Sequence, residues 1–158
     1  MKYFTYDLIE KLGSLKTPDY KEYEHQWEIN AKKYWNLFEN NKNTLTKEVF
    51  EFFKKGQLSD SLLQSVIFRQ ERKRNKIEFN VAISFISYYD DKCKSLFYKN
   101  VVGYSYKQKE AKIEESALYI LYNELLKDGS EWTHNILLSN GDEIFIRFKS
   151  ILLSNLNF

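Results

Sequence analysis

The end of the chain carries the pattern that most restricts its fold. Residues 130–153 have the sequence SEWTHNILLSNGDEIFIRFKSILL, in which two runs of alternating apolar and polar residues flank an Asn-Gly pair. Alternation with a period of two is typical of a half-buried strand, and Asn-Gly between two such runs is a strong hairpin signal. The pattern therefore predicts an antiparallel hairpin and a chain that contains a β-sheet.

The length of the hairpin loop decides which side chains share a face of the sheet. A two-residue loop would mix polar and apolar side chains on the same face. A three-residue loop of Ser139, Asn140 and Gly141, with the glycine in the left-handed conformation, leaves one face almost wholly apolar. We therefore predict the three-residue loop. The cross-strand pairs that it implies are Trp132 with Phe148, His134 with Ile146, and Ile136 with Ile144.

The composition is that of a globular protein with one domain. Of its 158 residues 43% are apolar and 29% charged, and one proline with five isolated glycines leaves no room for a flexible linker. We expect a single domain over residues 1–158, helical at about 5–56 and rich in strands at about 60–153. The fold class that this predicts is α+β, with N-terminal helices packed on a C-terminal antiparallel β-sheet, a meander of about five to six strands.

Helical periodicity marks the first third of the chain. A short helix is expected from Tyr6 to Leu12, where Gly13 ends it. Thr17 before Pro18 predicts the start of a long amphipathic helix, and Thr46 predicts the cap of a third helix that ends near Gly56. The apolar stripe of the long helix consists of Tyr20, Tyr23, Trp27, Ala31, Tyr34 and Phe38.

Alternation replaces helical periodicity after about residue 60. A hairpin is expected from strands at 65–72 and 77–87, followed by a turn at 88–91 and a strand at 93–104. The segment 109–127 fits two structures. It has the apolar stripe of a helix, but residues 117–126 also alternate like a strand that enters a tight Asp-Gly turn before Trp132.

Charge and cysteine content narrow the classes of function. The 24 basic and 22 acidic residues leave a net charge of +2, which is too balanced for a dedicated nucleic-acid binder judged by total charge. One cysteine, Cys93, excludes an internal disulfide and indicates a reducing compartment. We expect no signal peptide and no membrane segment, because no stretch approaches the roughly 20 apolar residues that span a bilayer. The expected location is the cytoplasm.

No set of residues predicts a catalytic site, a metal site or a cofactor. His25 lies between Glu22 and Glu28 at helical spacing, which fits a solvated helix face better than a metal site. His134 falls on the apolar face of the final hairpin, where a neutral, hydrogen-bonded histidine at the margin of the core is expected. Two aspartates precede Cys93, and neighbouring carboxylates disfavour a reactive thiolate.

A basic segment at residues 69–76 is the sharpest charge feature. It holds three of the four arginines of the chain and falls at the tip of the first predicted hairpin. Such a patch can contact phosphates or an acidic protein, or it can be a solvated turn that prevents strand pairing. The aromatic content of 17% provides candidate interface anchors, of which two lie in the turn at 88–91. The candidate binding residues are Arg69, Arg72, Lys73, Arg74, Lys76, Tyr88 and Tyr89.

Three segments resemble an uncharacterised family of small bacterial proteins. They are the opening MKYFT, a mid-chain LSDS before paired strands, and an end of the form Y-x-E, Asp-Gly turn, W-x-H-x-I-L-L-S-x-G-x-E-I-x-I-x-F-K. Members of the family commonly carry Leu-His-Asp where this chain has Leu58, Ser59 and Asp60, so no role of that histidine is transferred. The resemblance favours a strand at 117–126. In size and style such proteins are similar to the immunity proteins that accompany bacterial polymorphic toxins.

Two functions are compatible with these observations. The first is a non-enzymatic protein-binding module, an immunity or inhibitor protein that blocks a cognate toxin, with that protein as its partner. The alternative is a nucleic-acid-binding or regulatory protein that uses the basic turn at 69–76.

Overall fold

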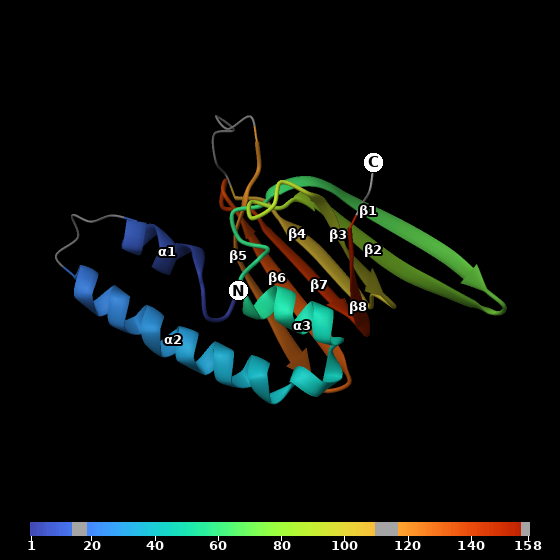
Figure 1. The fold of residues 1–158 in the computed structure, drawn as a ribbon, viewed down its shortest axis with the longest axis horizontal. Helices are drawn as coiled ribbons and strands as arrows, with labels where there is room; N and C mark the ends of the chain where they lie inside the picture. Colours follow the sequence, from blue (N-terminus) through green and yellow to red (C-terminus); the bar gives the residue numbers. More distant parts are fainter. Residues whose placement is uncertain (14–18, 110–116, 156–158) are drawn as a thin grey trace.

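The computed structural model describes residues 1–13, 19–109 and 117–155. Three α-helices precede eight strands along the described chain (Figure 1). The helices are α1 (Tyr6–Gly13), α2 (Tyr20–Asn40) and α3 (Lys47–Lys54), with a short 3₁₀ helix, η1 (Lys42–Thr44), between the last two. The strands are β1 (Leu62–Lys73), β2 (Lys76–Ile86), β3 (Cys93–Lys99), β4 (Gly103–Lys107), β5 (Ile120–Asp128), β6 (Glu131–Leu138), β7 (Glu143–Phe148) and β8 (Ser150–Asn155).

The strands form two antiparallel four-stranded sheets, with the orders β1-β2-β3-β8 and β4-β7-β6-β5. The α+β fold class and the N-terminal position of the helices are confirmed. The predicted meander of five to six strands is too small, since the structure has eight strands. Their division into two sheets was not predicted.

The extra strands arise where the chain passes from one sheet to the other. Asn100 adopts a left-handed conformation with φ 53°, which separates β3 from β4 within the segment that was predicted as one strand. Lys149 is the single residue between β7 and β8. The two crossings lie together, because Lys149 N–H donates to the Lys99 carbonyl and Val102 N–H donates to that of Arg147. Asparagine tolerates the left-handed region, but nothing in the surrounding alternation marks a break.

The hydrophobic core fills the space between the two sheets, and α3 contributes to it from one end. Tyr98 of β3 meets Phe148 of β7 edge to face at 4.9 Å, and Phe52 of α3 meets Phe85 of β2 at 5.9 Å. Aromatic and branched side chains from both inner faces are buried together. The largest fully buried side chains are Trp132, Tyr34, Tyr98, Phe38, Phe85, Phe148, Leu58, Ile83, Leu96, Ile120, Leu125 and Ile136.

The final hairpin has the predicted register. All three predicted pairs are present, and Leu138 N–H donates to the Asp142 carbonyl across a loop of three residues. Gly141 takes the left-handed conformation with φ 86°. Trp132, His134 and Phe148 are all buried on the inner face, as the apolar face requires.

Replacing Gly141 with alanine is expected to cost more stability than the same change at Gly129. Both glycines have positive φ, so an added Cβ costs about 1 kcal/mol at either position. At Gly141 the new Cβ would also lie 2.7 Å from Cδ of Lys109 and 3.1 Å from Cε2 of Tyr6, whereas at Gly129 no atom lies within 4 Å. Urea unfolding of the two variants measures the difference, and equal losses would contradict the expected crowding at Gly141.

The predicted helices are confirmed where the structure describes them. Thr46 caps α3, since its hydroxyl accepts a hydrogen bond from Val49 N–H, and Gly56 follows the helix with φ 64°. The aromatic stripe of α2 faces the sheet, with Tyr34 and Phe38 buried. The cap predicted at residues 17–18 lies outside the described residues.

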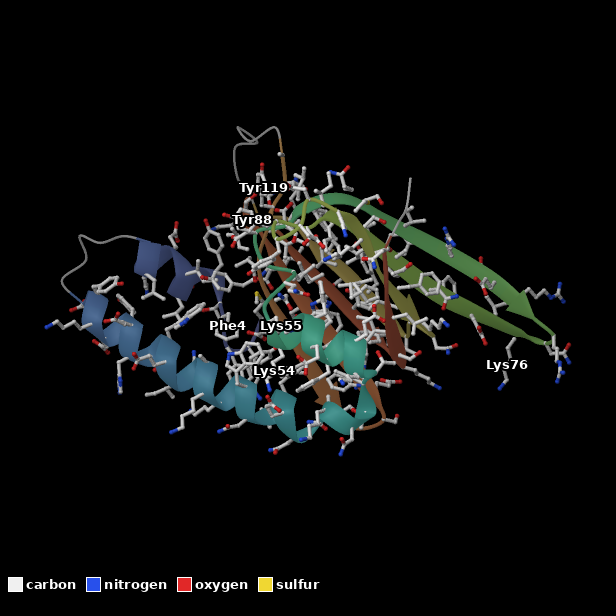
Figure 2. The ribbon with its side chains drawn as sticks, in the orientation of Figure 1. Phe4, Lys54, Lys55, Lys76, Tyr88 and Tyr119 are labelled. Carbon is white, nitrogen blue, oxygen red and sulfur yellow. The ribbon has the colours of Figure 1, made fainter. Side chains whose placement is uncertain are left out.

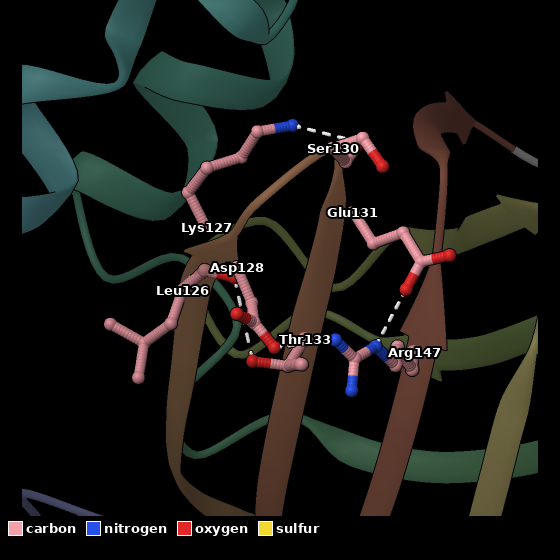
Figure 3. Close-up of polar contacts among 7 residues, drawn as sticks. All are labelled: Leu126, Lys127, Asp128, Ser130, Glu131, Thr133 and Arg147. Atoms are coloured by element: carbon pink, nitrogen blue, oxygen red, sulfur yellow. Dashed lines mark hydrogen bonds and ion pairs between the residues drawn. The ribbon is translucent and has the colours of Figure 1, made fainter.

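The ambiguous segment is a strand where it is described. β5 pairs with β6 from Ile120 to Asp128, and residues 110–116 lie outside the described residues. At the end of this hairpin Arg147 of β7 binds two carboxylates, with Nε 2.6 Å from Glu131 and Nη2 2.5 Å from Asp128 (Figure 3). Arg147, the one arginine outside the basic segment at 69–76, therefore links the β5–β6 turn to β7 through two ion pairs.

Candidate protein-binding surface

The β1–β2 hairpin extends beyond the rest of the sheet. β3 pairs with β2 only from Val81 to Ile86. The chain after β3 reaches two more residues of β2, since Val101 N–H donates to the Phe79 carbonyl and Asn100 N–H to Oδ1 of Asn80. Residues 76–78 of β2 pair with β1 alone. We call residues 67–79 the arm. Figure 1 shows the arm leaving the sheets on the side away from α1 and α2. A two-residue turn of Arg74 and Asn75 closes it.

One face of the arm continues the apolar core face into solvent. Along β2 the exposed fraction rises from 0% at Ile83 and 1% at Val81 to 52% at Phe79 and 60% at Ile77. Phe68 of β1, which pairs with Val81, is 55% exposed. Residues 77, 79, 81 and 83 share a face because side chains alternate along a strand, and burial on this face ends between Val81 and Phe79.

Tyr104 of β4 contacts the apolar side chains of the arm through Phe68. Its ring meets that of Phe68 edge to face at a centroid distance of 4.6 Å. Large apolar side chains that remain exposed beside each other indicate a surface that another molecule covers. We call Phe68, Ile77 and Phe79 the apolar face of the arm.

The basic residues of the arm do not all share one face. Arg72 pairs with Ile77 and therefore lies on the apolar face, whereas Arg69 pairs with Asn80 on the opposite face. Lys73 pairs with Lys76 at the end of the hairpin, and Arg74 follows in the turn. The sequence suggested one compact basic patch, but strand alternation distributes these residues over both faces and the tip.

The acidic residues of the arm are confined to the face opposite the apolar one. Glu71 pairs with Glu78, and alternation places both on the face of Arg69. That face carries charges of both signs. The apolar face carries Arg72 and ends at Arg74, so its rim is positive.

Tyr88 and Tyr89 lie far from the basic residues of the arm. They are 69% and 55% exposed in the turn between β2 and β3, at the opposite end of β2 from Lys76 (Figure 2 labels Tyr88 and Lys76). The 11 residues of β2 span roughly 36 Å. An ion pair of 2.9 Å between Lys94 and Asp90 holds this turn. The seven candidate residues therefore form two separate groups.

A shallow groove lies on the outer face of the sheet at the base of the arm. It has a volume of about 590 Å³. Ile67 and Arg69 of β1 line one part of it, and Phe97 of β3 and Leu152 of β8 line another. This groove is a second partly apolar surface near the arm. It lies on the opposite side of the sheet from Phe68, Ile77 and Phe79.

The two histidines occupy opposite environments. His25 is exposed on α2, as are Glu22 and Glu28, and among the described residues no three His, Cys, Asp or Glu side chains are grouped to hold a metal ion. His134 is completely buried rather than at the margin of the core, and burial lowers its pKa to about 3. Its ring is therefore neutral at physiological pH.

His134 belongs to a buried hydrogen-bonded chain. Burial raises the pKa of the Tyr98 phenol well above its usual value, so its hydroxyl is the donor to Nδ1 of His134 at 2.7 Å. The proton of the neutral ring then lies on Nε2, which donates to Oδ1 of Asn123 at 3.3 Å. The arrangement satisfies buried polar groups between the sheets and is structural.

No family model matches this chain, and no curated protein matches it either. The resemblance to small bacterial proteins and to immunity proteins therefore stays a prediction. Among the described residues, none of the helices is both long and apolar enough to cross a membrane.

Sequence reasoning missed the apolar half of this surface. Phe68, Ile77 and Phe79 were predicted only as residues of the strands at 65–72 and 77–87, and they were not among the candidate binding residues. Their signal in the sequence is that apolar residues continue in alternation until one position from Lys76, at the tip of the hairpin. An apolar residue so close to the tip, such as Ile77, is buried only if another part of the protein covers the hairpin as far as its turn.

Proposed function

We propose that the protein is a non-enzymatic protein-binding module of the cytoplasm, an immunity or inhibitor protein that blocks a cognate toxin, and that the arm is its contact surface. The observation that carries this proposal is the exposed apolar face of the arm, with Ile77 and Phe79 each more than half exposed. Apolar and aromatic side chains of this kind dominate binding energy when a partner buries them.

The charges of the arm indicate the chemistry of the partner. Arg72 on the apolar face and Arg74 and Lys76 at the tip form a positive rim around apolar side chains. A complementary partner has an apolar recess bordered by carboxylates, which bind arginine with two parallel hydrogen bonds. The module thus fits an acidic protein surface.

The backbone at the tip supports a functional role for Arg74. Four described residues other than glycine have positive φ, and Arg74, with φ 55°, is the only one of them that is not Asp or Asn. Glycine or asparagine would adopt this conformation at lower cost, by roughly 1 kcal/mol for glycine. Strain of this kind is concentrated at functional positions, which is consistent with a need for the guanidinium there.

The double substitution Ile77→Ser and Phe79→Ser is expected to weaken partner binding about 700-fold. Two central apolar anchors contribute about 2 kcal/mol each when truncated, and each 1.4 kcal/mol is a factor of ten. The measurement is co-expression with the product of the neighbouring gene, co-purification, and titration calorimetry of the purified pair. Because both side chains are largely exposed, the variant keeps its fold.

Leu37→Ser is the matched control, because Leu37 is also a large apolar side chain, 43% exposed, but lies on α2 away from the arm. It is expected to bind like the wild type. Arg74→Gly separates charge from stability, since it removes the guanidinium and relieves the positive φ. Weaker binding is expected together with a free energy of unfolding higher by about 1 kcal/mol. Wild-type affinity in the Ile77/Phe79 variant would exclude the arm as the contact surface.

Nucleic acid is the second candidate ligand. The observation that favours it is the proximity of exposed rings, Phe68 and Phe79, to Arg72 in the arm, because single strands bind through stacked bases and neutralised phosphates. Under this function a fluorescent single-stranded oligonucleotide binds at low salt, and binding falls when Arg72 and Arg74 become alanine. Absence of any binding at low salt removes this candidate and leaves the protein-binding function.

A further inference from the structure

A small aromatic pocket lies between the N-terminal segment, α2, the chain after α3, and β5. Its volume is about 170 Å³. Six of its lining side chains are aromatic: Phe4, Trp27, Tyr34, Trp35, Phe53 and Tyr122. Figure 2 labels Phe4, which lies beside α2. The pocket has the size of a cavity that holds one benzene-sized ligand, roughly 150 Å³, and is too small for a nucleotide.

The rings surround the pocket as a box and not as a stack. The planes of Trp27 and Tyr122 meet at 71° with centroids 5.0 Å apart, and those of Tyr34 and Trp35 meet at 66° and 4.9 Å. Phe4 and Tyr34 meet at 74° and 5.3 Å. Successive walls therefore turn by large angles, which presents ring faces and edges from several directions.

This geometry disfavours a flat aromatic ligand. Such a ligand needs two parallel ring faces about 7 Å apart, which is two carbon–carbon contact distances of about 3.5 Å. The most nearly parallel pair of pocket rings, Phe4 and Tyr122, is inclined by 26°, and its centroids are 6.1 Å apart. A third ring does not fit between them, whereas a compact, roughly spherical group can contact several walls at once.

The electrostatic environment of the pocket favours a cation. Among the described residues that line the pocket there is no Lys, Arg, Asp or Glu, and the faces of Trp, Tyr and Phe rings are negative. Two carboxylates act on the walls from outside the pocket. Burial, and then the charge of Asp60, raises the pKa of Tyr122; burial mainly, with the charge of Glu124, raises that of Tyr34.

Two of the lining side chains are polar, Ser59 and Asn123, and we call them the polar end of the pocket. Asn123 Oδ1 already accepts a hydrogen bond from Nε2 of His134. The amide N–H groups of Asn123 are therefore the donors available to a ligand, and the hydroxyl of Ser59 can donate or accept. A ligand with a compact cationic head and a short hydroxyl arm would satisfy both ends.

We propose that this pocket binds a quaternary trimethylammonium group of the kind that choline carries. The ring faces contact the methyl groups and stabilise the delocalised positive charge, and the polar end holds the hydroxyl. This inference does not depend on the arm or its partner, because the pocket lies on the helical side of the molecule.

Titration of the full-length protein with choline tests the proposal, with calorimetry and tryptophan fluorescence as readouts. Choline is expected to bind at least tenfold more tightly than 3,3-dimethyl-1-butanol, which has the same shape without the charge. Trp27 and Trp35 report the binding, because both line the pocket while Trp132 is buried in the core. Equal affinity for the neutral compound, or no saturable binding of choline, would overturn the proposal.

Trp27→Leu is expected to weaken choline binding at least tenfold, and Trp27→Phe to restore part of it, because phenylalanine keeps a ring face. Tyr23→Leu is the matched control, since Tyr23 is an aromatic residue of the same helix outside the pocket, with its ring under Lys11. Two further compounds identify the source of the trimethylammonium group. Binding of phosphocholine more tightly than choline supports the proposal and indicates a lipid headgroup. Tighter binding of acetylated trimethyl-lysine amide supports it and indicates a modified lysine side chain.

Discussion

Replacing Glu124 with alanine is expected to lower the free energy of unfolding by about 3–5 kcal/mol. Its side chain is completely buried, and its carboxylate accepts hydrogen bonds from the N–H groups of Lys2, Tyr3 and Phe4 at 2.6–2.7 Å. The N-terminal segment pairs with no strand in the described structure, so these N–H groups depend on the carboxylate. Removing it leaves three donors without a partner, and hydrogen bonds to charged groups contribute about 1.5–3 kcal/mol each.

Urea unfolding at neutral pH measures this loss, and hydrogen exchange at residues 2–4 shows where it arises. Glu124→Gln is expected to lose less than alanine, since it retains one oxygen acceptor. Glu143→Gln is the control, because Glu143 is partly exposed and binds the N-terminal ammonium at 3.1 Å; a loss below about 1 kcal/mol is expected there. A loss of less than 1 kcal/mol in Glu124→Ala would show that the carboxylate does not hold the N-terminus.

Folding stability is expected to fall as the pH is lowered from 6.5 to 4.5, and His134 is the cause. Burial lowers its pKa to about 3 in the folded protein from the ordinary 6.5 of the unfolded chain, so below pH 6.5 the unfolded chain binds a proton that the folded chain does not. Stability is then complete above pH 6.5 and declines by about 1.4 kcal/mol per pH unit below it. Between pH 6 and 4.5 the expected loss is about 2 kcal/mol.

Urea unfolding at several pH values isolates this contribution. Two aspartates also have lowered pKa values. A hydrogen bond with Lys94 mainly lowers the pKa of Asp90, and for Asp142 burial is outweighed by its hydrogen bonds. The stability that these two carboxylates contribute is lost only near and below pH 4. His134→Gln is expected to lower the free energy of unfolding but to remove its dependence on pH between 4.5 and 6.5. His25→Gln, at the exposed histidine, is the control and is expected to keep it. A slope that persists in His134→Gln would assign the effect to another group.

The final hairpin was predictable because its information is local. The glycine of the loop and the alternation on either side are sufficient to exclude the two-residue turn, and the pairing of Ile136 with Ile144 follows. Helix ends at Gly13 and Gly56 were predictable for the same reason.

Features that depend on distant parts of the chain were not predictable. Glu124 precedes the core residue Leu125, so alternation places it on the outer face of β5, where a solvated strand residue would lie. The structure instead buries it, with the N-terminal segment, about 120 positions away, bonded to its carboxylate. The change of sheet at Lys149 depends on its bond with the Lys99 carbonyl. His134 was predicted to be neutral and hydrogen-bonded, but its burial requires Tyr98 from the facing sheet.

The candidate binding surface was predicted in part. The hairpin and its basic tip follow from the sequence around Arg74 and Lys76, because charges and a polar turn separate two alternating runs. Exposure of Ile77 and Phe79 does not follow, since strand alternation is the same whether or not a neighbouring strand covers the residues. It depends on how far the facing sheet covers this face of β2, which is buried at Ile83 and Val81 but not at Phe79.

Hydrogen–deuterium exchange of the protein with and without the product of the neighbouring gene tests the central proposal most directly. If the arm is the contact surface, amides within residues 67–79 gain protection in the complex, and those of the 88–91 turn do not. Protection confined to the helices or to the 88–91 turn, with exchange in the arm unchanged, would contradict it.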